Sequence, residues 1–570
     1  ISVLCFMVIP MCITVTYMKD KSVLNEALEY LYAPDYSKQY SIDKKSLQKT
    51  LNVIRRHQEK SSDFNLFSSS IPYLTSYFNW LVLDNQSLSH TKLNYIGRVF
   101  FASSQLNTEP NFRSQAEITN ISVNSNYDKS QNAWKSWVDL EITNGNTNLA
   151  EYATTIDLPE GCWISDYYLY VEGKKEFGIL AEKKAAMWVY SNIRNENKDP
   201  GILHYLTGNK VAFKVFPFSP SETRKTGIEF LCKERTSFFI DSRLIILGNW
   251  EETVRENVET ENFAYISANQ KLTLKKAERK LYPHFLIDAS AGKEKFSDDF
   301  TKQVEALSKG WYSDELRESK QISFVNTYIN PEVMYEGGFY LERAIETVLL
   351  NAYNKQSYPF IVVVTDSIQN AILEKDFSDI EFAFPELAEF ASLGSDGTYR
   401  IHSLLKKPKE GILTPYIQMR DALEYKLSDS SVVYLPKGYE PSIVLKKEIF
   451  EIAETEIKEK NWQSALAMHA KRMSHFLHPE KAVKEWQTLV KYSFISKIMT
   501  PETSYLVVEN EAQKAALMHK QKQVLSGNKL LDLNGDTQQM SEPSLWLLLA
   551  LLGLALVLYN YVFKRSHHKR

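Results

Sequence analysis

Residues 157–231 read DLPEGCWISDYYLYVEGKKEFGILAEKKAAMWVYSNIRNENKDPGILHYLTGNKVAFKVFPFSPSETRKTGIEFL, and this stretch decides the fold of the middle of the chain. Several runs alternate apolar and polar residues, so that Val211, Phe213 and Val215 share one face of an expected strand. Turns that contain proline and glycine separate the runs. The pattern predicts a β-rich module over about 107–245.

One segment inside this stretch has a helical pattern. From Glu182 to Ile193, the apolar residues Ala185, Val189 and Ile193 recur on one face. We therefore expect a short amphipathic helix that packs on the sheet. The turn 158–161, this helix, the turn 199–201 and the strand that ends at 215–217 resemble, in order and spacing, the vault and inter-alpha-trypsin inhibitor (VIT) domain.

A second module follows over 281–435, where apolar strands alternate with helical stretches. This alternation is typical of a parallel α/β sheet. Its place after the VIT-like block resembles the order found in proteins with a von Willebrand factor type A-like domain. The expected fold class is multi-domain α+β: a β-rich VIT domain, a doubly wound α/β type A-like domain, helical flanks and a C-terminal transmembrane helix.

The type A family carries a metal-ion-dependent adhesion site built from Asp-x-Ser-x-Ser, a threonine after a Gly-Gly-like turn and a later aspartate. This chain has Asp288, Ser290 and Asp366, but Gly292 and Phe339 stand where a serine and the threonine are expected. The resemblance implies an incomplete site for Mg²⁺ or another divalent cation, which prefers six oxygen ligands. The alternative, which we favour, is that both aspartates end strands and accept hydrogen bonds from local backbone amides.

The flanks of these modules are expected to be helical. Residues 22–105 contain helical pieces without an assigned family. Residues 436–530 form an extension, which we expect to be helical and charged over 436–500. The turn 500–504 and the strand after it resemble the segment that follows the type A domain in inter-alpha-trypsin-inhibitor-like proteins. Residues 1–18 are nearly free of charge, and we expect a transmembrane helix of a longer protein that is truncated here.

The end of the chain has three consecutive parts. A linker over 531–543 ends in the motif Met540-Ser541-Glu542-Pro543, and residues 544–563 are uncharged and long enough to span a bilayer. The basic tail 564–570 contains Lys564, Arg565, Lys569 and Arg570. It is expected to be cytoplasmic, with the bulk of the chain outside. The three parts resemble the MSEP-CTERM sorting signal of bacterial proteins, which implies an exosortase as partner and release to the cell surface after processing.

Composition narrows the function classes further. The formal net charge of −3 gives no basis for nucleic-acid binding. Four cysteines without CxxC spacing argue against a zinc site and a disulfide scaffold. For Cys162 and Cys232 we favour two separate buried thiols, and a single bridge is the alternative if this region lies outside the cytoplasm.

No catalytic motif is present in the sequence. There is no GxSxG, Walker-type loop or GxGxxG in a strand-to-helix setting, and His469, His475 and His478 lack the spacing of an HExxH site. We expect these histidines to be solvent-facing helix residues. The sequence therefore predicts a membrane-associated envelope protein that is not an enzyme and binds a protein or another envelope ligand, without a required cofactor. An envelope hydrolase with an unrecognised site is the alternative.

Overall fold

The computed structural model describes residues 2–60, 75–83, 86–102, 116–195, 200–251, 256–310, 317–406, 420–428, 430–526 and 538–539. The contacts divide the chain into two compact units. The smaller unit combines residues from both ends of the chain, and the larger one holds Ala33–Ser37 and Asn94–Leu525. Both modules expected from the sequence lie in the larger unit.

The smaller unit is mainly helical. It contains α1 (Ser2–Tyr32), α2 (Lys44–Lys60), α3 (Thr75–Leu83) and a two-residue ladder between β1 (Gln86–Ser87) and β26 (Gln538–Gln539). Buried leucines of α1 and α2, such as Leu28 and Leu51, supply its core. The segment expected to end at residue 18 continues as one helix to Tyr32. None of the helices in the described residues combines the length and apolar character that a membrane crossing needs.

Two antiparallel sheets form the β-rich part of the larger unit. The first has the order β2-β3-β10-β5-β6 and the second the order β4-β9-β8-β25-β7. Their bounds are β2 Glu117–Asp128, β3 Ala133–Thr143, β4 Ala150–Asp157, β5 Cys162–Val171, β6 Lys174–Phe177, β7 Ile179–Glu182, β8 Gly201–Tyr205, β9 Lys210–Phe218, β10 Thr223–Cys232 and β25 Thr503–Val507. Val138 and Leu140 of the first sheet and Val211, Phe213 and Val215 of the second share one core, which confirms the expected common face of β9.

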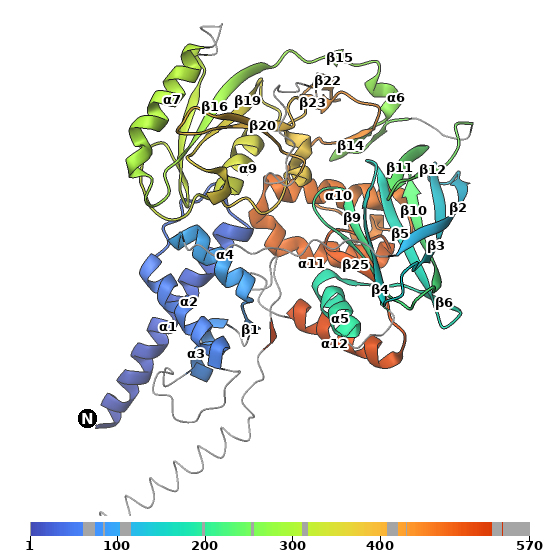
Figure 1. Ribbon diagram of the computed structural model, residues 1–570, viewed down its shortest axis with the longest axis horizontal. Coiled ribbons are helices and arrows are strands. Elements are labelled where there is room, and N and C mark those ends of the chain that lie inside the picture. The colour runs from blue at the N-terminus through green and yellow to red at the C-terminus, as the bar shows by residue number, and fades with distance from the viewer. Residues whose placement is uncertain are drawn as a thin grey trace, which may run out of the picture. The chain divides into compact units, whose positions relative to one another are not determined.

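The expected helix of this module is α5 (Lys183–Asn195). Ala185, Val189 and Ile193 are buried together with Leu506 of β25 and Leu517 of α12 (Glu511–Ser526). The structure therefore confirms the predicted amphipathic helix. Figure 1 shows α5 and α12 beside the second sheet.

The α/β part contains a six-stranded sheet in the order β18-β17-β16-β19-β20-β21. The bounds are β16 Lys280–Asp288, β17 Gln321–Val325, β18 Ile329–Asn330, β19 Ser357–Val364, β20 Glu389–Leu393 and β21 Tyr399–Ser403, with helices α7 (Ser297–Lys309) and α9 (Leu341–Asn351). The four central strands run parallel, and the edge strands β18 and β21 run antiparallel to their neighbours. Phe285 and Ile287 pack with α7, whereas Leu286 packs with α9, so the two helices cover opposite faces.

Smaller elements join these parts. They comprise β11 (Thr236–Ile240), β12 (Arg243–Leu247), β13 (Val258–Glu259), β14 (Phe263–Ile266), α6 (Ala268–Lys271), β15 (Lys275–Lys276), β22 (Ala422–Lys426), β23 (Val432–Pro436), β24 (Ser442–Leu445), α10 (Trp462–Leu477) and α11 (Pro479–Ser496), together with short 3-10 turns at Glu294–Phe296, Ile368–Asn370, Ser378–Ala383 and Glu454–Glu456. The strand β24 pairs with β14, and β22 pairs with both β15 and β23.

The expectation that 436–500 is helical is wrong for its first part. Residues 442–445 form β24, and helix α10 begins only after Asn461, whose side chain accepts a hydrogen bond from the amide of Ser464. Phe450, Ile452 and Ile457 are buried beside α10. Their burial under a neighbouring helix outweighs the helical propensity of the charged residues between them.

Cys162 and Cys232 form a disulfide with their Cα atoms 4.3 Å apart. The register of β5 and β10 places the two residues directly opposite each other. The expectation of two separate thiols is therefore wrong, because the sequence could not show this pairing of strands 70 residues apart.

Candidate functional site

The three residues of the predicted metal site come together at one edge of the α/β sheet. Asp288 ends β16, and Asp366 follows β19 after Thr365. The parallel pairing of Ile287 with Val364 places both strand ends at the same edge. Ligand sites of α/β sheets are generally formed at this edge.

Asp288 is fully buried, and both of its carboxylate oxygens are occupied by local donors. One oxygen accepts hydrogen bonds from the amide and the hydroxyl of Ser290, at 3.0 and 2.7 Å. The other accepts from the hydroxyl of Thr365 at 2.8 Å. Burial raises the pKa of Asp288, while these hydrogen bonds and the charge of Lys293 act in the opposite direction.

A lysine supplies the positive charge at this edge. The ammonium of Lys293 forms an ion pair with Asp366, and only 12% of the lysine side chain is exposed. Gly292 has a φ of +86°, a conformation that a serine adopts only with strain. The glycine that replaces the expected serine therefore allows the loop to turn toward Asp366.

The loop expected to supply a threonine supplies no side-chain oxygen. Phe339 is 2% exposed and belongs to the core around α9. The backbone of helix α4 (His90–Phe101) contacts Gly338, the residue before Phe339. The Val99 carbonyl accepts a hydrogen bond from the Gly338 amide at 2.9 Å. A Cβ atom at Gly338 would lie 2.1 Å from the Arg98 carbonyl oxygen.

These residues do not fit a divalent cation. Mg²⁺ needs about six oxygens in octahedral geometry. Here Asp288 is hydrogen-bonded, Asp366 is paired with a lysine, and Phe339 is apolar. Across the described ranges, no group of three or more His, Cys, Asp and Glu side chains has an arrangement that could hold a metal ion.

A cavity of about 780 Å³ lies elsewhere in the larger unit. Its wall combines the turns after β4 and β8, strand β11, the end of α6, the turn Ser378–Ala383, the segment from β23 to β24, and one face of α10. Ligand pockets in proteins commonly measure 300–1,000 Å³. No local sequence pattern indicates the cavity, since its wall comes from segments as far apart as Asp157 and Phe476.

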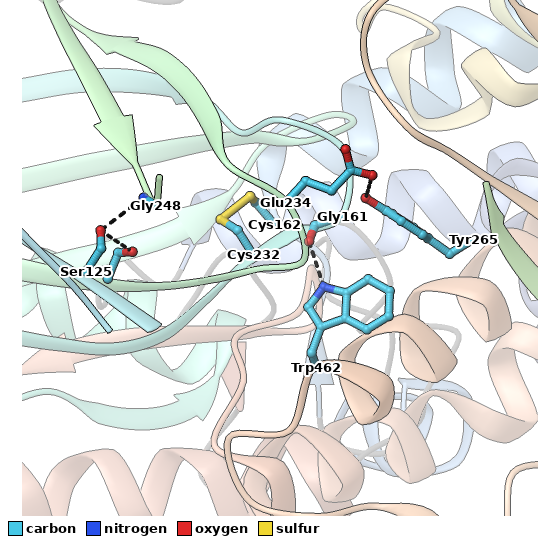
Figure 2. Close-up of a disulfide and its surroundings, with 9 residues drawn as sticks. Ser125, Gly161, Cys162, Cys232, Glu234, Gly248, Tyr265 and Trp462 are labelled. Carbon is cyan, nitrogen blue, oxygen red and sulfur yellow. Dashed lines mark hydrogen bonds between the residues drawn. A yellow bond between two sulfur atoms is a disulfide. The ribbon is translucent and has the colours of Figure 1, made fainter. Parts of the chain in front are cut away.

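The turn 158–161 of this wall is held by contacts with Tyr265, Trp462 and the disulfide. Gly161 has a φ of +79°, and a Cβ there would lie 2.8 Å from the Tyr265 ring. Its carbonyl accepts a hydrogen bond from the Trp462 indole at 2.9 Å, and the next residue is Cys162 of the disulfide (Figure 2). The sequence indicated the turn, but not its fixation by Trp462 and Tyr265.

Glu160 projects from this turn into the cavity wall. Asn209 donates a hydrogen bond to one carboxylate oxygen at 2.9 Å. The other oxygen is inaccessible and has no hydrogen-bond partner among the described residues, and the Nε2 atom of His469 lies 3.6 Å from it. Burial, opposed by the Asn209 hydrogen bond and assisted by the charge of Glu381, raises the pKa of Glu160 to about 7.

Lys271 and Ser442 form a second polar group in the wall. The Lys271 ammonium lies 2.9 Å from the Ser442 hydroxyl and 2.8 Å from the Glu440 carbonyl oxygen, and Lys271 is 3% exposed. Burial lowers the pKa of Lys271 to about 8, although the nearby glutamates act in the opposite direction. The other basic side chains of the wall are paired with carboxylates, as Arg472 is with Asp379 and Arg420 is with Glu381.

The histidines of α10 are less exposed than expected. His475 is 7% exposed and lies 2.7 Å from a carboxylate oxygen of Glu485. His469 lines the cavity, and burial lowers its pKa to about 4. The expectation of solvent-facing residues is wrong for both, because α10 is packed against other elements on more than one face.

The sorting motif Met540–Pro543, the apolar segment 544–563 and the basic residues Lys564, Arg565, Lys569 and Arg570 lie outside the described residues.

Comparisons with known proteins do not place the chain in a family. No family model matches the chain, and no curated protein matches it. A weak structural match is the GH20 exo-β-N-acetylglucosaminidase from Vibrio harveyi, solved in complex with N-acetylglucosamine, with 7% identity and a TM-score of 0.11. That match covers 62% of this chain and 45% of the enzyme chain, and at this TM-score it supports no conclusion.

Proposed function

We propose that this chain is a membrane-associated protein of the bacterial envelope whose larger unit lies outside the cytoplasm and binds a protein or another envelope ligand. The observation that carries the proposal is the ligand-sized cavity, whose wall includes a turn held by the Cys162–Cys232 disulfide. Structural disulfides persist mainly in oxidising compartments. A binding cavity whose wall is held by a disulfide is consistent with a protein that acts outside the cytoplasm.

The resemblance of 540–570 to the MSEP-CTERM signal supports the same location. Pro543 would start the apolar helix at the membrane boundary, and the basic tail would hold the motif at the membrane face. On this proposal an exosortase acts on the motif, and the processed protein is released to the cell surface. The VIT-like and type A-like modules remain part of the proposal as the interaction modules.

Mass spectrometry of the mature protein from its native host tests this proposal. We expect the segment after the motif to be absent when the exosortase is active, and retained when the exosortase gene is deleted. In denaturant, where buried thiols would also be accessible, Cys162 and Cys232 should resist alkylation until a reductant is added. An intact Arg570 in the host with active exosortase, together with freely alkylated thiols, would contradict the proposed location.

The Lys271–Ser442 pair favours a second candidate function, an envelope hydrolase. A lysine with a lowered pKa beside a serine hydroxyl can act as a general base for a nucleophile, and here the Glu440 carbonyl orients the lysine. Neutral Lys271 would take the hydroxyl proton as Ser442 attacks an acyl carbon, and would return it to the leaving group. A water molecule would then hydrolyse the acyl-serine ester and regenerate the serine.

Labelling of the full chain with a fluorophosphonate probe tests this second candidate. A hydrolase with this pair would be labelled in the wild type and in Ser237→Ala, an exposed serine in the same wall, but not in Ser442→Ala or Lys271→Met. Absence of labelling in the wild type would remove the hydrolase and leave the binding proposal untouched.

A further inference from the structure

The carboxylates of Asp288 and Asp366 lie beside the same hydroxyl at the carboxyl edge of the α/β sheet. The Thr365 hydroxyl lies 2.8 Å from an oxygen of Asp288 and 3.4 Å from an oxygen of Asp366. Asp288 is fully buried, and the Asp366 side chain is 23% exposed. A positive charge beside two such carboxylates stabilises their ionised forms in this partly buried environment.

We infer that the ammonium of Lys293 takes the place of a divalent cation at this edge, so that the edge keeps its structure without a metal. The lysine is carried by the loop after β16 and forms its ion pair with Asp366 of the loop after β19. It therefore joins the two loops that a metal ion would otherwise join. This role is independent of the function proposed for the cavity.

The loop backbone explains how the lysine reaches this place. The amide of Lys293 donates a hydrogen bond to the carbonyl of Ser290 at 3.2 Å, which closes a turn through Gly292. The amide of Ala291 donates to the carbonyl of Gly337 at 3.0 Å, which fixes the same loop to its neighbour. With the loop held on both sides, the lysine side chain extends to Asp366, beyond the end of β19.

The loop before α9, which contains Gly338 and Phe339, also keeps its structure without a metal ion. Phe339 stands at the position of the expected threonine, and its ring is buried in the core around α9, so it offers no oxygen ligand. The Val99 carbonyl accepts hydrogen bonds from the Gly338 amide and, at 2.7 Å, from the Thr327 hydroxyl. This loop is therefore held by protein contacts and needs no ion. A metal ion would have to displace Lys293 and would still find no oxygen ligand at Phe339.

Thermal unfolding of the full chain in detergent, with Mg²⁺, Mn²⁺ or Ca²⁺ at up to 10 mM, tests the inference. The wild type should show no shift of its melting temperature with any of the three ions. Lys293→Ser removes the ammonium and adds an oxygen, so it should melt about 4 °C lower. It should then regain about 2 °C in 10 mM metal, because a site present only in the folded state stabilises that state.

Two further variants make the comparison specific. Lys295→Ser is the matched control: this lysine lies two residues away, with its ammonium 4.9 Å from the Phe296 ring, and should behave like the wild type. The metal response of Lys293→Ser should disappear when Asp366→Asn is added, because the metal then loses a carboxylate ligand. If Lys293→Ser fails to fold, Lys293→Gln serves the same comparison.

Three outcomes would overturn the inference. A folded Lys293→Ser that melts lower but regains nothing in any of the three metals would show an ordinary ion pair at a place where no metal ion can bind. A metal shift in the wild type equal to that in Lys293→Ser would show that the lysine does not replace the ion. A folded Lys293→Ser with an unchanged melting temperature and no response to any of the three metals would show that this edge needs no cation at all.

Discussion

The position of Glu160 is set mainly by contacts of the next two residues, Gly161 and Cys162. Gly161 packs on Tyr265 and accepts the Trp462 hydrogen bond, and Cys162 is covalently fixed. The turn is thus rigid, while one carboxylate oxygen of Glu160 has no hydrogen-bond donor among the described residues. A buried acceptor without a donor destabilises the folded state by about 1–3 kcal/mol, more when it is charged.

The raised pKa of Glu160 predicts a pH-dependent stability. Between its unfolded pKa of 4.5 and its folded pKa of about 7, the folded state binds the proton more tightly than the unfolded state. The contribution of Glu160 is therefore present below pH 4.5, falls as the pH rises to 7, and amounts to about 3 kcal/mol at most. Glu160→Gln should lack this decline and be more stable than the wild type at pH 8.

Chemical denaturation at pH 5 and pH 8 measures the effect. The other ionisable side chains around Glu160, namely Lys271, Glu381, Glu440, His469 and Arg472, are present in both proteins, so the difference between the two profiles reports on Glu160. Glu176→Gln, an exposed residue of β6, is the control and should keep the wild-type profile. If Glu160→Gln and the wild type lost the same stability between the two pH values, the carboxyl would have an ordinary pKa.

At the scale of elements, the local sequence pattern could not indicate to which sheet β25 belongs. It lies between β7 and β8 although more than 290 residues separate it from either. The resemblance of 500–504 to a turn before a strand predicted the strand itself. Only the completed second sheet shows that the strand belongs to the β-rich module.

Leu506→Ala should therefore loosen strands far away in the sequence. Leu506 is fully buried with α5, and its truncation should cost about 3 kcal/mol. We expect faster amide hydrogen exchange in β7 and β8 as well as in β25. Met518→Ala on α12, where the side chain is 50% exposed, is the control and should change little. Faster exchange confined to β25 would show that the strand is not an integral part of the sheet.

At the scale of the whole molecule, most of the larger unit depends on contacts between distant segments. The strand β24 pairs with β14, and α10 packs with residues of both the β-rich part and β14. The cavity exists because these segments meet. A module boundary drawn from the sequence alone, at 245 or 435, therefore separates residues that share one core.

The sequence by itself determined the local features: the alternation of β9, the amphipathic face of α5, and the aspartates at the end of β16 and just after β19. These follow from side-chain direction, which repeats over a few residues. The tertiary structure decided the ion pair of Lys293 with Asp366, the approach of Lys271 to Ser442 and the pairing of Cys162 with Cys232. Those contacts join segments 70 to 171 residues apart, so no local pattern could indicate them.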